Sequence, residues 1–90
     1  MRLTIPQDVL SRELDGEVVL LDLRSGRYFG LNETAAAVWT MLKDGVDDDE
    51  MAGRLVEEFD VTTQRARDDI DAFVSVLLER GLASRPTTRV

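Results

Sequence analysis

The hydrophobic pattern of this 90-residue chain changes its period once, near Leu31, and that change limits the possible folds more than any other feature. Up to Leu31 the apolar residues stand in short segments separated by turn-forming residues, whereas beyond it they recur at helical spacing. Because a chain of this length makes one small domain, both halves must share a single core. The sequence therefore predicts an α+β domain in which strands come first and helices follow.

The first half of the chain carries two hairpin signals. Asp15-Gly16 suits a two-residue type I′ turn, and Arg24-Ser25-Gly26 suits a three-residue loop with Gly26 in the left-handed conformation. Two consecutive hairpins predict a three-stranded antiparallel meander, with strands at residues 9–14, 17–23 and 27–31. The middle segment is the most apolar, so we expect it at the centre of the sheet.

The second half carries three helical segments. Asn32 is a favourable N-cap for the first, which Gly45 ends; residues 47–50 open the second, which runs to Asp60. Thr62 or Thr63 caps the third, and Gly81 ends it. The apolar stripe of this third helix consists of Ala66, Ile70, Phe73, Val74, Leu77 and Leu78. A meander with three helices stacked on one side is a winged-helix-like fold, which we expect over residues 1–84, with 85–90 as a flexible tail.

The chain contains no histidine and no cysteine. This absence excludes thiol nucleophiles, imidazole bases, disulfides, and zinc or iron–sulfur sites with the usual ligands. The acidic run of residues 47–50 lacks the calcium-loop pattern, and consecutive helical residues point in different directions, so it is typical of a helix N-terminus. We therefore expect no enzymatic activity, no cofactor and no bound metal.

The charge balance argues against nucleic acid as a ligand. Eleven Lys and Arg stand against 18 Asp and Glu, a net charge of −7, whereas nucleic-acid binding relies on neutralising phosphates. The N-terminus lacks the apolar core of a signal peptide, and no apolar segment approaches the roughly 20 residues that span a bilayer. We expect a cytoplasmic protein without a membrane partner.

The predicted sheet has two edges of different character. Residues 9–14 carry Ser11, Arg12 and Glu13, whereas residues 27–31 carry one charge, Arg27, followed by aromatic residues. Charged side chains discourage another chain from pairing with an exposed strand edge. The third strand is therefore the edge at which a further strand can add.

A second observation comes from the third helix. Ala72 and Val76 lie just beside its apolar stripe, next to Asp69. They are either ordinary helix-surface residues or one wall of a groove. If this wall faces the third strand, the natural ligand is an extended peptide that adds to the sheet, with apolar anchors supplying most of the affinity.

Several segments of the chain resemble one known family. They are Leu20-Leu21-Asp22, residues 26–34 (Gly-Arg-Tyr-Phe-Gly-Leu-Asn-Glu-Thr), Ala37-Val38-Trp39, and Leu78-Glu79-Arg80-Gly81-Leu82. The resemblance is to the PqqD-like family, the pyrroloquinoline-quinone synthesis protein D group, whose fold is known as the precursor-peptide recognition element. It covers roughly residues 9–84, and its most specific part is the strand-to-helix junction at residues 28–34.

The resemblance implies a non-catalytic, winged-helix-like protein that binds the leader segment of a ribosomally made precursor peptide and presents it to a processing enzyme. In that family the leader adds to the third strand and packs against the third helix. Carried over by position, this implies strand partners at Arg27, Tyr28, Phe29, Gly30 and Leu31, and a helix wall of Asp69, Ala72, Phe73 and Val76.

Three functions remain open at this point. The chain stands alone, like the leader-binding proteins of lasso-peptide biosynthesis, whose partner is a separate leader peptidase or modifying enzyme. It is also compatible with pyrroloquinoline-quinone synthesis, where the partner is a radical enzyme. A winged-helix DNA-binding regulator has the same architecture, but the third helix carries an excess of acids. An acyl-carrier role lacks its Asp-Ser-Leu attachment site.

Overall fold

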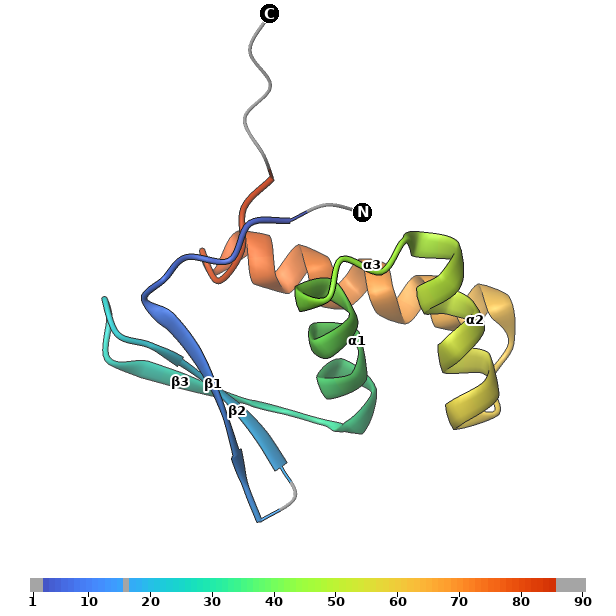
Figure 1. Cartoon of the computed structure of the whole chain (residues 1–90), viewed down its shortest axis with the longest axis horizontal. Coiled ribbons are helices and arrows are strands. Elements are labelled where there is room, and N and C mark those ends of the chain that lie inside the picture. The colour runs from blue at the N-terminus through green and yellow to red at the C-terminus, as the bar shows by residue number, and fades with distance from the viewer. Residues whose placement is uncertain (1–2, 16, 86–90) are drawn as a thin grey trace, which may run out of the picture.

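The computed structural model describes residues 3–15 and 17–85. Three strands come first: β1 (Val9–Leu14), β2 (Glu17–Asp22) and β3 (Arg27–Leu31). Three helices follow: α1 (Glu33–Lys43), α2 (Asp48–Phe59) and α3 (Thr63–Glu79). The predicted α+β, winged-helix-like order of strands and helices is confirmed (Figure 1).

The three strands form one antiparallel sheet in the order β1-β2-β3, so β2 is central as predicted. Asp15 has a positive φ of 52°, in keeping with a tight turn between β1 and β2, whereas the second turn residue, Gly16, lies outside the described residues. The expected end of the middle strand at residue 23 is wrong by one residue. The carboxylate of Asp22 accepts a hydrogen bond from the backbone N–H of Arg24 at 3.0 Å, which turns the chain. Residues 23–26 therefore form a four-residue loop, in which Gly26 has the predicted positive φ, 75°.

Each helix begins at a side-chain cap. The side-chain oxygens of Asn32, Asp47 and Thr62 accept hydrogen bonds from backbone N–H groups three residues further on, at 2.8, 2.9 and 3.1 Å. Such caps satisfy donors that have no partner inside the helix. Gly45 and Gly81 have positive φ values just beyond the ends of α1 and α3, which confirms them as helix-ending residues.

The helices cover one face of the sheet. Leu20 on β2 is fully buried and Val9 on β1 is 6% exposed, and both project toward the helices. On the outer face Tyr28 is 72% exposed. From the helices the core receives mainly Val38, Trp39, Met51, Leu55, Ala66, Val74 and Leu77.

Of the six residues predicted as the α3 stripe, four are buried, whereas Phe73 and Leu78 are half-buried and pack against the core. Phe73 is therefore within reach of solvent as well as of the core.

The segments before β1 and after α3 pair with each other. The backbones of Thr4 and Ser84 exchange two hydrogen bonds, of 2.7 and 2.8 Å, and so form an isolated antiparallel bridge. Figure 1 shows these two segments side by side above the sheet. Most of the expected tail, residues 86–90, lies outside the described part of the chain.

Candidate functional site

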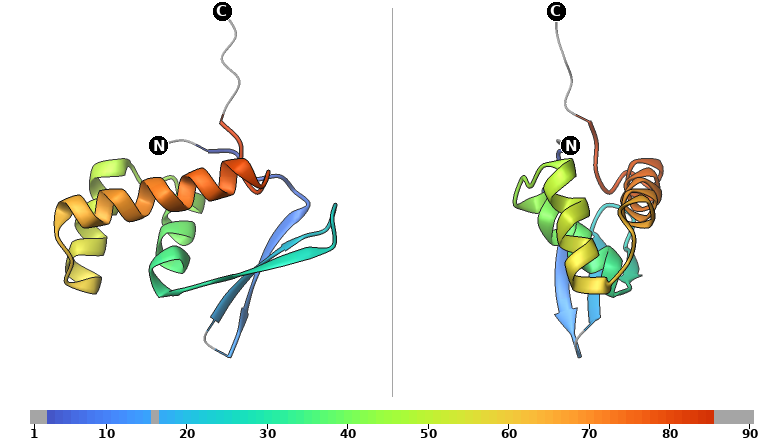
Figure 2. Two further views of the ribbon diagram at one scale, coloured as in Figure 1. Left: turned by 180° about the vertical axis from the view of Figure 1, so that it is seen from behind. Right: turned by 90° about the vertical axis from the view of Figure 1, so that its right-hand side faces the viewer.

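The edge strand β3 and the helix α3 face each other across a groove, and Figure 2 (left) shows how the two elements lie. Between the described residues of β3 and α3 there is no close backbone contact, although both elements pack with α1. A hollow of about 280 Å³ lies between them. It is lined by Leu20, Phe29, Gly30, Leu31, Asn32, Ala35, Phe73, Val76, Leu77, Arg80 and Leu82.

A second hollow, of about 340 Å³, continues the groove toward the first turn of α1. It shares Asn32, Ala35, Phe73 and Val76 with the first hollow, and Asp69 and Ala72 extend it along α3. The two hollows are therefore parts of one groove with β3 on one side and α3 on the other.

The pleat of β3 decides which of its side chains reach this groove. Phe29 pairs across the sheet with Leu20, whose side chain is fully buried, so Phe29 projects toward the helices. Because strand side chains alternate, Arg27 and Leu31 share this face, and Tyr28 takes the other. One side of the groove thus combines the edge of the strand with the half-buried ring of Phe29.

The α3 side of the groove is apolar because the side chains that line it lie next to the buried core residues of the same helix. Phe73 is half-buried. Val76, one turn further on, is 43% exposed although its side chain is apolar. An exposed branched side chain beside a hollow is the kind of anchor point that a ligand can cover. Of the two interpretations of Ala72 and Val76, the structure favours the groove wall, because both line the hollow next to α1.

The structure brings most of the predicted site residues together. Phe29, Gly30, Leu31, Phe73 and Val76 line the central hollow, Asp69 and Ala72 line the hollow next to α1, and Arg27 lines a third hollow at the β2–β3 loop. Tyr28 lines none of the three and projects from the outer face of the sheet. A role for Tyr28 is therefore limited to its backbone or to the outer face.

Sequence reasoning missed several groove residues. Arg80 lies four residues after Val76 and seven after Phe73, so helical spacing alone places it on the same face of α3. Asn32 and Ala35 line both the central hollow and the hollow next to α1, because the chain turns from β3 directly into α1. The sequence feature that could have identified these two residues is the short junction between the third strand and the first helix.

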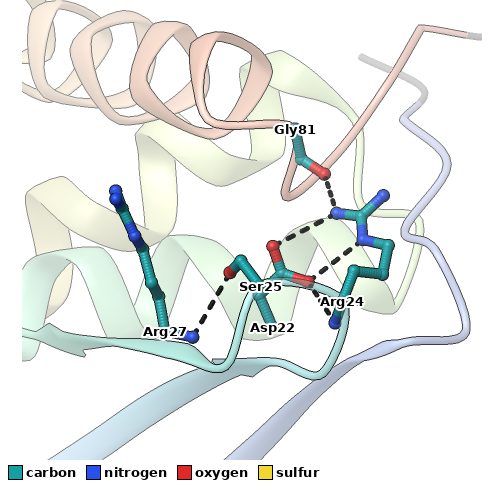
Figure 3. A network of polar contacts seen from close by, with 5 residues as sticks. All are labelled: Asp22, Arg24, Ser25, Arg27 and Gly81. Carbon is teal, nitrogen blue, oxygen red and sulfur yellow. Dashed lines mark hydrogen bonds and ion pairs between the residues drawn. The ribbon is translucent and has the colours of Figure 1, made fainter.

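A polar network holds the β2–β3 loop against the end of α3. The Nε of Arg24 donates to the carboxylate of Asp22 at 3.0 Å, and its Nη2 donates to the backbone carbonyl of Gly81 at 2.7 Å (Figure 3). Hydrogen bonds from Arg24 hold the pKa of Asp22 below the usual value of an aspartate, against the opposing effect of burial. The network joins the loop before β3 to the residue after α3, so it fixes how far apart the two walls stand at that end.

The acidic residues examined as possible metal ligands have structural roles. Asp47 caps α2, Asp49 accepts from Arg67 at 2.7 Å, and Glu50 accepts from Arg54 at 3.1 Å. This confirms the interpretation of residues 47–50 as a helix N-terminus. Across residues 3–15 and 17–85 no group of acidic side chains is arranged to hold a metal ion.

No helix in the described part of the chain combines the length and the hydropathy needed to cross a membrane.

Two solved structures match nearly the whole chain. One is described as "Lasso peptide synthetase B1 complexed with the leader peptide"; it is 35% identical, with a TM-score of 0.88, over 94% of this chain and 100% of its own. The other, "TbiB1 in Complex with the TbiA(beta) Leader Peptide", is 29% identical, with a TM-score of 0.82, over 94% of this chain and 99% of its own. No curated protein sequence matches the chain with significance.

One family model also matches, over residues 17–83, which include β2, β3 and all three helices. Its description is coenzyme PQQ synthesis protein D. The matched segment contains the strand edge, the helix wall and the junction between them that form the groove. The chain therefore belongs to the PqqD family.

Proposed function

We propose that this chain is a non-catalytic adaptor of lasso-peptide biosynthesis. It binds the leader segment of a ribosomally made precursor peptide, which adds as a strand to β3 and packs against α3. It then presents the bound leader to a separate leader peptidase or modifying enzyme. The observation that carries the proposal is the groove between an exposed strand edge and an apolar helix wall, in a chain 35% identical to a protein described in complex with its leader peptide.

The energetics of such a groove favour anchors over backbone pairing. Four or five backbone hydrogen bonds at about 0.5–1.5 kcal/mol each barely offset an association cost of about 4–15 kcal/mol. Each apolar side chain that the leader buries against Phe29, Phe73 or Val76 adds about 1.5–3 kcal/mol. We therefore expect two or three anchors to set the affinity, while β3 sets the register.

The ion pairs on α3 argue against a DNA-binding role. Arg67 donates to Asp49 at 2.7 Å, and Arg65 donates to Asp69 at 3.2 Å. Cations that already face carboxylates on their own surface gain little from phosphate groups. The absence of histidine and cysteine supports a role in binding rather than in catalysis.

A second candidate within the same class is an adaptor in pyrroloquinoline-quinone synthesis that serves a radical enzyme. The observation that favours it is the family model, whose description names that pathway. Both candidates use the same groove and differ in the leader and the enzyme. Binding assays with precursors of each class separate them.

The test is a charge placed in the helix wall. Val76→Asp should weaken binding of a labelled leader peptide by more than about tenfold, because a carboxylate then has to be buried against apolar side chains. The probe is the TbiA(beta) leader peptide, whose binding is measured by fluorescence anisotropy.

The matched control is Ser75→Asp, which adds the same charge one residue away, on an exposed position that lines none of the described hollows. It should bind as the wild type does, and both variants should keep the helical circular-dichroism spectrum. Equal binding by Val76→Asp and the wild type would show that the leader does not use this groove.

A further inference from the structure

The end of the groove at the β2–β3 loop differs chemically from the rest. A hollow of about 450 Å³ lies there, lined by Asp22, Ser25, Arg27, Phe29, Glu79 and Arg80. It meets the apolar hollow at Phe29 and Arg80, which line both. Figure 3 shows Arg27 extending from β3 in the direction of α3. The groove therefore runs from a charged end to an apolar centre.

The two arginines at this end are not held by carboxylates. Within residues 3–15 and 17–85, neither guanidinium makes a hydrogen bond or an ion pair; that of Arg80 lies over the ring of Phe29, 5.2 Å from its centroid. Four other arginines in a chain of net charge −7 do have a carboxylate partner: Arg24, Arg54, Arg65 and Arg67. Arg12 and Arg85 also have no carboxylate partner within residues 3–15 and 17–85, but Arg27 and Arg80 are the two of these four that line the groove.

The local charge count at this end is positive. Asp22 is neutralised by Arg24, which leaves Arg27 and Arg80 against Glu79, a net of one positive charge. Stacking on Phe29 holds the Arg80 side chain in place, so less of its freedom is lost when it binds a ligand. Such an arrangement favours a carboxylate ligand.

The register of β3 sets the spacing between Arg27 and the two apolar residues of the strand that share its face. Arg27, Phe29 and Leu31 pair with Asp22, Leu20 and Val18 and share the face that points toward the helices. A peptide strand added beside β3 puts every second side chain on that same face. One side chain then lies beside Arg27, the next beside Phe29 and the next beside Leu31.

We propose that Arg27 and Arg80 form a carboxylate subsite at this end of the groove. The bound peptide carries Asp or Glu two residues from one apolar anchor and four residues from a second. This inference rests on the proposed function and specifies its ligand class, an acidic residue at one end of a segment whose next two alternate positions are apolar. It also fixes which end of that segment lies beside Arg27, since reversing it would press the carboxylate against Leu31 and Phe73.

The test starts from a displayed library of random linear peptides, selected separately against three proteins. They are the wild type, Arg27→Gln/Arg80→Gln, and the control Arg12→Gln/Arg54→Gln, which removes the same charge from exposed positions on β1 and α2. Acidic residues at the stated spacing should be enriched with the wild type and the control, and lost with Arg27→Gln/Arg80→Gln.

A peptide selected on the wild type is then used to measure how much the acidic residue contributes to affinity. Changing its acidic residue to Gln should weaken binding to the wild type and to the control about tenfold, as expected for a charge-assisted pair, and should leave binding to Arg27→Gln/Arg80→Gln unchanged. Added salt should weaken the wild-type complex more than that of the Arg27→Gln/Arg80→Gln variant.

The results separate failure of the subsite from failure of the groove. If selected peptides lose binding with Val76→Asp but show no acidic preference, or if the Gln change costs the same in every variant, the subsite is wrong and the groove stands. If no selected peptide responds to Val76→Asp, the groove itself is wrong and the subsite falls with it.

Discussion

β1 and β3 are both edges of one sheet, yet of their described residues those of β3, and not those of β1, line the hollows described above. β1 carries exposed charges at Arg12 and Glu13, and Lys43 at the end of α1 donates to the hydroxyl of Ser11 at 3.4 Å. Across the groove from β3 stands α3, far enough away to leave an apolar hollow. An open edge is therefore not enough to bind a peptide. A wall that holds the side chains of the added strand is also needed, because backbone pairing alone barely offsets the cost of association.

The largest expected effect is a difference in amide exchange between the two edge strands when the leader peptide binds. Saturating leader peptide, at about a hundred times its Kd, should slow exchange of the amides of β3 that it covers roughly a hundredfold. The outward-facing amides of β1, which exchange without global unfolding, should exchange as in the free protein. Hydrogen–deuterium exchange read by NMR checks this, and protection of β1 in place of β3 would reverse the assignment of the binding edge.

The next effect concerns two neighbours on β3 that project to opposite faces. Phe29→Ala should weaken leader binding about thirtyfold, a loss of about 2 kcal/mol, because it removes the ring from the groove. Tyr28→Ala, on the outer face, should weaken it less than about threefold. Calorimetric titration of both variants checks the difference, and a larger loss for Tyr28→Ala would place the ligand on the outer face.

A smaller effect should follow when the link between the β2–β3 loop and α3 is removed. Because Arg24 lowers the pKa of Asp22, the ionised carboxylate stabilises the fold above the usual aspartate pKa of about 4, and this contribution is lost as the pH falls through the lowered value. Asp22→Asn should therefore lower the melting temperature by several degrees at neutral pH and bring it closer to the wild type in acid.

Thermal unfolding followed by circular dichroism between neutral pH and about pH 2 checks this prediction. Asp68→Asn is the control, since Asp68 is an exposed aspartate bonded to neutral Gln64. A constant difference between Asp22→Asn and the wild type at every pH would mean that the carboxylate does not act through its charge.

The smallest effect is expected at Gly30. A Cβ built there meets no atom within 4 Å, and its φ is not in the left-handed region. Gly30→Ala should therefore change the free energy of unfolding by less than about 0.5 kcal/mol. Because the new methyl group lies on the outer face, leader affinity should also stay within about twofold. Urea unfolding and a binding titration check both expectations. If Gly30→Ala keeps its free energy of unfolding but loses much of its leader affinity, the ligand approaches the outer face of β3.

Much of this fold follows from local patterns in the sequence. The turn residues, the side-chain caps at Asn32, Asp47 and Thr62, and the glycines after α1 and α3 act within a few residues, so they can be predicted without tertiary contacts. The misplaced strand end at Leu23 came from a side-chain bond of Asp22 that competes with strand pairing. The distinction between the two edges also follows from the sequence, because the charges of β1 are local.

The tertiary structure decided what the edge of β3 faces. Helical spacing placed Ala72, Phe73 and Val76 on one flank of α3, but only the packing of α1 between the sheet and α3 sets the width of the hollow in front of them. In the same way, Arg27 and Arg80 are 53 positions apart in the chain, and nothing local links them. They line one hollow because the network of Asp22, Arg24 and Gly81 ties the end of α3 to the β2–β3 loop. Local chemistry determined the elements, and long-range packing determined the groove.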